Sequence, residues 1–264
     1  SVQIGSSSGL RLACKGHRTV ISVGEKVPRM DDKPVAVVAG VGSGTGEALV
    51  KRFAEGGYRV AMIARKAERL ERIAGEIPEA SAYPCDMSDI ETFRATLTRI
   101  KKELGPIKIA IHNGARAVRE YYTKIDPLEF ESTFRVNTTA LLVLAQEVGP
   151  DMVEMGDCAI LVTGNTGAWR GKPHFTGFAP SKSAQRILAE ALARELGPQG
   201  VHVAYVTIDA AIDIWWVRER RGPDFPEDQF AKPADIAGEC FHIAHQPKST
   251  WSFNVELRPF NENW

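Results

Sequence analysis

The chain has little cysteine, and the cysteines that it has form no recognisable framework. They are scattered, with no C-x-x-C pair and no histidine-rich motif beside them: Cys14, Cys85, Cys158 and Cys240. This spacing argues against a disulfide-stapled domain and against a zinc site, and it is typical of lone thiols in a reducing compartment. We therefore expect no metal centre, and we expect Cys85 and Cys158 to be buried structural thiols.

Long hydrophobic runs and an excess of charge of either sign are also lacking. Apolar runs such as residues 139–145 fall far short of the roughly 20 residues that span a bilayer as a helix. The 33 basic and 33 acidic residues cancel, which indicates neither a nucleic-acid nor an anionic-membrane partner. With 44% apolar residues, the 264-residue chain can bury a sizeable core. We expect a soluble, cytoplasmic protein.

The first 31 residues differ from the rest of the chain. They are basic and poor in acids, and no clear apolar period runs through them. A leader of this composition is typical of an organelle transit sequence, although convincing amphipathicity is missing. Alternatively, Met30 is an original start and the residues before it are an added extension. We place the domain itself at residues 32–264 and expect its chemistry not to depend on residues 1–31.

What the sequence does have is a glycine-rich stretch between an apolar run and a helical pattern. Residues 35–39 are continuously apolar, as in a strand buried on both faces, and apolar residues recur at helical spacing from Ala48 to Ala54. Glycines let the backbone turn tightly, and the following helix N-terminus favours an anion such as a pyrophosphate. The candidate phosphate-binding residues are Gly40, Gly42, Ser43, Gly44, Thr45 and Gly46.

The spacing of these glycines points to a family. The G-x-G-x-x-G fingerprint fits in no register, whereas Gly40-x-x-x-Gly44-x-Gly46 resembles the pattern of the short-chain dehydrogenase/reductase family. The resemblance runs from about residue 33 to the C-terminus. It agrees with the alternation of strand and helix patterns, which predicts a single α/β domain of Rossmann type. We expect a doubly wound, mostly parallel sheet with helices on both faces and ligands at the carboxyl ends of its strands.

The end of the second predicted strand, residues 59–65, indicates which dinucleotide is bound. An acidic residue normally takes the ribose hydroxyls of NAD about 20 residues past the glycines. Here Ala64 takes that place and Arg65 follows it. A guanidinium binds a 2′-phosphate with charge-assisted hydrogen bonds, so we expect NADP(H), although an exposed arginine at a strand end is often only a solvated charge.

Further cofactor residues come from the resemblance. It implies that Asp86 and Met87 flank the adenine ring, although Asp86 could instead cap a helix, as Ser88 or Asp89 could. It also implies that Asn113 braces the central strand beside the cofactor. His112, in place of the family's asparagine, is expected to be a packed or surface histidine.

The family's catalytic residues are only partly present. The resemblance implies that the backbone of Asn137, on a helix predicted from Phe130, holds a water, and that Lys182 grips the nicotinamide ribose. The tyrosine of the family's Tyr-x-x-x-Lys is Phe178 here, and Asn165 stands in place of the catalytic serine. We expect Asn165 to donate a hydrogen bond to the substrate oxygen. Replacement proton donors near the gap are His174, Thr176 and water.

These features together predict an NADP(H)-dependent oxidoreductase that acts on a small-molecule carbonyl or alcohol. The alternative is a catalytically inert NADP(H)-binding protein, a redox sensor or partner subunit, and a lyase or isomerase on the same fold is a third possibility. The segment 213–230, rich in tryptophan, arginine and proline, corresponds to the family's substrate lid. Surplus apolar surface on the helices with Asn137 and Lys182 predicts a homodimer or homotetramer.

Overall fold

The computed structural model describes residues 33–262, so the N-terminal extension lies outside the described part. Its centre is a sheet of parallel strands in the order β3-β2-β1-β4-β5-β6-β9. These strands are β1 Val35–Ala39, β2 Arg59–Ala64, β3 Ala80–Pro84, β4 Ile107–His112, β5 Cys158–Asn165, β6 Val201–Ile208 and β9 Asn254–Leu257. A separate pair joins β7 Ala211–Ile212 to β8 Phe230–Ala231.

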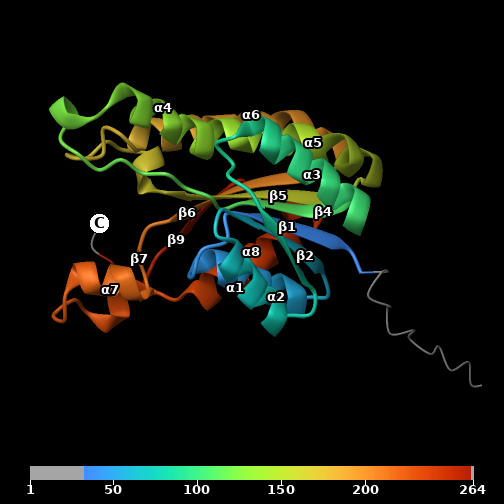
Figure 1. The fold of residues 1–264 in the computed structure, drawn as a ribbon, viewed down its shortest axis with the longest axis horizontal. Helices are drawn as coiled ribbons and strands as arrows, with labels where there is room; N and C mark the ends of the chain where they lie inside the picture. The colour runs from blue at the N-terminus through green and yellow to red at the C-terminus, as the bar shows by residue number, and fades with distance from the viewer. Residues whose placement is uncertain (1–32, 263–264) are drawn as a thin grey trace, which may run out of the picture.

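Helices cover both faces of the sheet, as Figure 1 shows. The longer helices are α1 Thr45–Glu55, α2 Ala67–Glu76, α3 Ile90–Leu104, α4 Pro127–Phe134, α5 Ala140–Met155, α6 Ala179–Leu196, α7 Trp215–Arg221 and α8 Pro233–Ala244. Side chains of α3, α5 and α6 pack in one apolar core, and those of α1, α2 and α8 pack in a second core on the opposite face. The predicted doubly wound α/β domain is therefore confirmed.

The strand order reverses beside β1, which lies between β2 and β4. Chain connections leave β1 and β4 in opposite directions there, so the carboxyl ends of these two strands border an opening. The glycine-rich turn follows β1 and Asn113 follows β4. The fold thus brings the predicted cofactor residues to one edge of the sheet.

The helix that holds Asn137 differs from the prediction. It begins at Pro127 rather than Phe130, because Asp126 accepts a hydrogen bond from the Leu128 N–H and proline suits the first helical position. It then passes through a π-helical turn, Arg135–Thr139, before continuing as α5. Such turns are frequent at functional sites, and Asn137 lies within this one.

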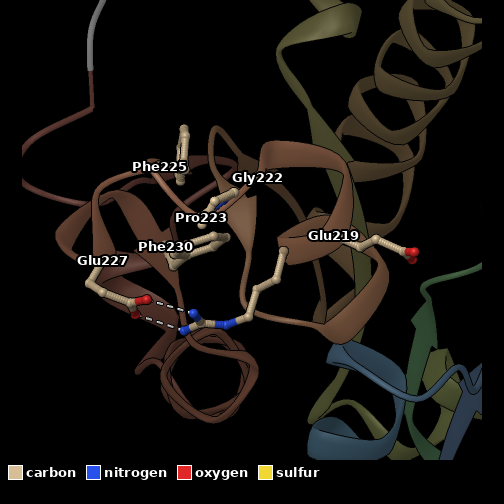
Figure 2. A pocket seen from close by; sticks show the side chains of 7 residues that line it. Glu219, Gly222, Pro223, Phe225, Glu227 and Phe230 are labelled. Atoms are coloured by element: carbon tan, nitrogen blue, oxygen red, sulfur yellow. Dashed lines mark hydrogen bonds and ion pairs between the residues drawn. The ribbon is translucent and has the colours of Figure 1, made fainter.

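The segment 213–230 is called the lid below. It contains α7 and is closed by the β7–β8 pair. Arg218 binds Asp213 at 2.5 Å and both carboxylate oxygens of Glu227 at 2.7 and 2.8 Å. Figure 2 shows the two bonds to Glu227 as dashed lines, beside Phe225 and Phe230. These residues line a cavity of about 300 Å³. The lid is therefore braced by its own side chains.

The described residues also show the state of the cysteines. Cys85, Cys158 and Cys240 are buried and free, which confirms the prediction for the first two. Within residues 33–262 we find no helix with the length and apolar character that crossing a membrane requires, and no group of histidine, cysteine and acidic side chains that could hold a metal ion.

Candidate active site

The turn after β1 needs glycine at two positions. Gly40 has a φ of +110°, and a Cβ there would lie 2.3 Å from the Gly114 backbone nitrogen. A Cβ on Gly46 would lie 2.6 Å from the Gly40 carbonyl oxygen. Since neither space admits a side chain, these glycines allow the close packing of β1, α1 and the β4 turn. Gly42 has open space around its Cα and is not sterically required.

The same turn presents hydrogen-bond donors without acceptors. Within residues 33–262 the backbone N–H groups at positions 42 to 46 meet no acceptor, and the N-terminus of α1 at Gly44 has no side-chain cap. Thr45 Oγ1 is buried and also lacks a partner there. Buried donors are nearly always satisfied, so this arrangement fits an anion held by the turn and by the α1 dipole.

Asn113 ties together three strand ends. Its Nδ2 donates to the Gly40 carbonyl oxygen at 2.7 Å, and its Oδ1 accepts from Thr163 Oγ1 at 2.9 Å. These bonds connect the ends of β1, β4 and β5. The expected bracing of the central strand is therefore observed in the hydrogen bonds of the side chain.

Arg65 and Asp86 lie at neighbouring strand ends. Arg65 is exposed just past β2, where Ala64 leaves the strand end without a carboxylate. Burial opposes the ionisation of Asp86, but hydrogen bonds from the N–H and Oγ of Ser88, together with the charges of Arg65 and Arg116, lower its pKa. Asp86 is thus a carboxylate within electrostatic reach of Arg65.

Two alternatives for the residues after β3 can now be separated. The cap of α3 is Asp89, which accepts from the Thr92 N–H, so Asp86 does not cap a helix. Met87 is buried against Gly114, where an added Cβ would lie 2.0 Å from Met87 Cε. Met87 therefore supports the turn after β4.

Lys182 is the deepest charged group of the site, with only 1% of its surface exposed. Its Nζ donates to the Thr163 carbonyl oxygen at 3.1 Å. Burial lowers its pKa to about 7. Phe178, at the N-terminus of α6, is also buried. The lysine therefore has no phenol beside it at the position where the resemblance places one.

Asn137 uses its whole side-chain amide to hold the loop after β4. Oδ1 accepts from the Arg116 N–H at 2.9 Å, while Nδ2 donates to the Arg116 carbonyl at 2.9 Å and to Ser181 Oγ at 2.8 Å. Its side chain thus couples the π turn to the loop and to α6. The expected role of its backbone in holding a water stays a prediction.

Asn165 ends β5 and keeps one donor free. Its Oδ1 accepts from the Gly167 N–H at 2.8 Å, which starts a short 3₁₀ turn at Thr166–Ala168. Its Nδ2 has no acceptor in the described residues, and the residue is only partly buried. A free amide donor at this strand end suits a substrate oxygen.

A buried polar pair beneath the site escaped the sequence analysis. His112 Nδ1 lies 3.1 Å from Gln185 Nε2, and His112 Nε2 lies 3.1 Å from the Val136 carbonyl. The amide donates to Nδ1, so the ring proton is assigned to Nε2. Burial and then the charge of Lys182 lower the pKa of His112 to about 3. His112 is therefore the packed histidine that was one of our two expectations.

Within the described part of the chain, neither candidate replacement donor forms a hydrogen bond with Lys182, whose Nζ bonds to Thr163. His174 and Thr176 are exposed, and neither forms a hydrogen bond with another described residue. The His174 backbone has a φ of +64°, and its ring lies 6.1 Å from that of Tyr121. A cavity of about 240 Å³ opens beside Thr176 and Phe175, at the start of α6.

Arg119 is a second residue that the sequence analysis missed. Its guanidinium carbon lies 5.2 Å from the Phe175 ring centroid and 5.7 Å from that of Phe178. The available signal was the basic character of the loop after Asn113. The positive charge of Arg119 thus lies over Phe178.

Comparison with known proteins identifies the family of the chain. Residues 34–210 match the family model for short chain dehydrogenase. A fatty acyl-CoA reductase from Mycobacterium tuberculosis is 32% identical over 63% of this chain, and the match spans 59% of that protein's length. A 3-ketoacyl-(acyl-carrier-protein) reductase from Brucella melitensis, solved with NADH, is 26% identical, has a TM-score of 0.77, and is matched over 86% of this chain and 97% of its own.

A metagenomic short-chain oxidoreductase solved with NADP shares the fold, with a TM-score of 0.75 at 23% identity over 86% of this chain and 97% of its own. The family model covers more than half of the chain, and its boundaries enclose the glycine-rich turn, Asn137, Asn165 and Lys182. The chain belongs to the short chain dehydrogenase family.

Proposed function

We propose that this protein is an NADP(H)-dependent oxidoreductase that acts on a carbonyl or alcohol. One observation carries the proposal: the unpaired donors at positions 42 to 46, with Thr45 Oγ1, lie at the same sheet edge as the buried ammonium of Lys182. A dinucleotide bound along that edge would contact the donors of the turn after β1 and, at the end of β5, the ammonium of Lys182. This is the ligand position expected at a reversal of strand order.

The cofactor half of the site is assigned as follows. The turn from Gly40 to Gly46 would hold the pyrophosphate, and Arg65 would bind the 2′-phosphate of NADP(H). Asp86 would accept a hydrogen bond from the adenine amino group, Met87 would support that ring's pocket, and Asn113 keeps the strand ends in register. The related Brucella reductase is bound to NADH, so the preference rests on Arg65 and on the missing acid at Ala64.

The chemical half of the site uses three polar residues. The dinucleotide, when bound, supplies or accepts a hydride at its nicotinamide ring. Lys182 would hold the nicotinamide ribose, Asn165 Nδ2 would donate to the substrate oxygen, and the Asn137 carbonyl would hold a water. An alkoxide formed by reduction needs a proton, and Phe178 has none to give. We infer that water held by Asn137 supplies it.

The sequence also allowed an inert NADP(H)-binding protein. Phe178 is the observation that favours it, since the family's phenol is absent. The comparisons lend it no support, because the relatives named above are described as reductases or oxidoreductases. Titration of NADPH and NADH into wild-type and Arg65→Ala protein tests the cofactor assignment, and transfer of labelled hydride tests the reaction.

We also infer self-association through α5 and α6. Leu142 on α5 is 39% exposed and Ile187 on α6 is 56% exposed, although both helices pack firmly on the sheet. Large apolar side chains at the surface of long helices often mark contacts between subunits. A homodimer or homotetramer formed by these helices would cover them.

A further inference from the structure

Lys182 and Gln185 are neighbours on the buried face of α6. They are three residues apart, so their side chains leave the helix on the same side, with about 5–6 Å between the Cβ atoms. The exposed fraction is 1% for Lys182 and 0% for Gln185. Among the described residues, Lys182 Nζ donates to the Thr163 carbonyl oxygen alone, at 3.1 Å. An ammonium with donors left over therefore lies one helical turn from a buried amide.

Hydrogen bonds tie Gln185 to the same strand ends as Lys182. Gln185 Nε2 lies 3.1 Å from His112 Nδ1, and the His112 carbonyl oxygen lies 3.5 Å from Thr163 Oγ1. Thr163 thus meets Lys182 through its carbonyl and His112 through its hydroxyl. These four residues form one connected buried group, with His112 at the end of β4, Thr163 on β5 and the other two on α6.

The orientation of the Gln185 amide follows from the Val136 carbonyl. That oxygen can only accept, and it lies 3.1 Å from His112 Nε2, so the ring carries its proton on Nε2. The ring is neutral, because burial lowers its pKa to about 3. Nδ1 is then an acceptor, and it takes a hydrogen bond from the NH₂ group of Gln185. Gln185 Oε1 is left over, buried and without a partner in the described part of the chain.

The unpaired oxygen and the unpaired donors complement each other. A buried acceptor without a hydrogen bond costs free energy, and so does a buried ammonium with unused donors. No described atom lies within hydrogen-bond distance of Gln185 Oε1, and polar groups separated in this way are often bridged by a water with two to four polar partners. No aspartate or glutamate is among the buried residues of the described chain. A carboxylate therefore does not compete for the ammonium there.

We propose that Gln185 Oε1 accepts a hydrogen bond from the Lys182 ammonium through one buried water and so positions that ammonium at the end of β5. This inference rests on the proposed function, in which Lys182 holds the nicotinamide ribose. Gln185 is a positioning residue, since it acts on the cofactor only through Lys182. Its amide is oriented in turn by His112. The ammonium is then held from two sides, by Thr163 and by Gln185.

The test follows the protonation of Lys182 in the cofactor-free protein. NMR spectra of protein labelled with ¹³C at the lysine ε carbons would be recorded from pH 5 to 10, and the resonance missing from Lys182→Met identifies the residue. Gln185→Met keeps the length of the side chain and removes the acceptor. It should lower the midpoint of the Lys182 titration by about 1 to 2 pH units, the scale of a hydrogen bond to a charged group. Gln185→Glu keeps an acceptor oxygen and adds a negative charge, so it should raise the midpoint above that of the wild type.

The matched control is Leu192→Ala. Leu192 is buried on α6 in the same apolar core, so its truncation weakens the packing of the helix and leaves Gln185 in place. This variant should unfold at a lower temperature and keep the wild-type midpoint of Lys182. An unchanged midpoint in either Gln185 variant, or the same midpoint in Gln185→Met and Leu192→Ala, would overturn the inference.

A kinetic measurement separates this inference from the proposed function. The titration needs no turnover, so a midpoint that responds in both Gln185 variants sustains the pairing even if no carbonyl compound is reduced, in which case the oxidoreductase proposal fails alone. Where a ketone is reduced with NADPH, the fall of kcat with rising pH should occur at lower pH in Gln185→Met. Reduction of a ketone, with midpoints and pH profiles that neither Gln185 variant changes, leaves the oxidoreductase standing and overturns the positioning role.

Discussion

The ammonium of Lys182 lies 3.1 Å from the backbone carbonyl oxygen of Thr163, which closes the end of β5 against α6. An ammonium has three donors, and this is the one hydrogen bond that the ammonium of Lys182 forms with the described residues. Only 1% of the residue is exposed. In the proposed function the remaining donors serve the cofactor ribose. Without a cofactor these donors have no acceptor among the described residues, and protonation of the buried Lys182 therefore costs free energy.

That cost predicts a dependence of stability on pH. An exposed lysine has a pKa near 10.4, whereas burial lowers that of Lys182 to about 7. Between these values the unfolded chain binds a proton that the folded protein has released, so stability rises with pH by up to about 1.4 kcal/mol per unit. Denaturant titrations of cofactor-free protein from pH 7 to 9 should show this slope.

Lys182→Met should flatten that slope, and Lys51→Met should keep it, because Lys51 is exposed on α1. The comparison between variants removes the contributions of other titrating groups. If Lys182→Met and wild type show the same slope, the lysine is not buried in solution as the structure has it.

Arg65 predicts the preference for NADP(H). Arg65→Ala should weaken NADPH binding by about 1.5–3 kcal/mol, the usual scale for hydrogen bonds to charged groups, and should leave NADH binding nearly unchanged. Arg69→Ala is a suitable control because Arg69 lies on α2, four residues further on. Fluorescence titration of both cofactors measures this. Equal affinity of the wild type for the two cofactors contradicts the assignment.

Tyr205 makes glycine necessary at position 164. A Cβ on Gly164 would lie 2.1 Å from Tyr205 Cζ, and the Tyr205 ring is fully buried. Gly164→Ala should therefore destabilise the protein by about 1–3 kcal/mol, as overpacking does. Thermal and denaturant unfolding provide the measurement.

Two further variants control the Gly164 experiment. Gly149→Ala, in α5 with nothing near its Cα, should be neutral or stabilising. Tyr205→Leu should cost less in the Gly164→Ala background than in wild type, because the two positions share one space. Additive effects would show that the ring and position 164 do not meet.

The exposed apolar side chains of α5 and α6 predict an oligomer. Light scattering of the wild type at micromolar concentration should show no dominant monomer. Ile187→Glu places a charge in the proposed contact and should shift the mass toward smaller species. Leu128→Glu, at a 71% exposed position on α4, should not change the mass. A monomeric wild type rules out the assembly.

Much of the fold could be predicted because its signals are local. The apolar run of β1, the glycines and the helical spacing of α1 follow one another in the sequence, and β–α alternation then prescribes a parallel sheet. The early start of α4 was also readable, since Asp126 and Pro127 form a cap and first turn. The π turn around Asn137 leaves no such local pattern.

The contacts that distinguish this site could not be read from the sequence, since they join distant positions. His112 and Gln185 are 73 residues apart and pair only because α6 crosses the end of β4. Arg119 lies over Phe178 because the loop after β4 meets the start of α6. Tyr205 fills the space beside Gly164 because β5 and β6 are neighbouring strands. Taken from the sequence alone, His112 and Phe178 are only departures from the family pattern. The structure shows that His112 packs against Gln185 and that Phe178 packs beneath Arg119.

The central claim is that the protein moves a hydride although Phe178 stands where the resemblance places a phenol. A placed general acid typically contributes about 10²–10⁴-fold, so we expect slow reduction by the wild type and faster reduction by Phe178→Tyr. His174→Ala and Thr176→Val should match the wild type, since both residues are exposed and form no hydrogen bond with another described residue.

The most direct measurement uses NADPH carrying deuterium at the transferred position of the nicotinamide ring, incubated with the wild type and a panel of ketones, aldehydes and quinones. Mass spectrometry of the products should find one deuterium at the former carbonyl carbon of at least one alcohol, and more of it with Phe178→Tyr. Tight NADPH binding with no deuterium in any product, from either protein, would contradict the account and leave a protein that only binds its cofactor.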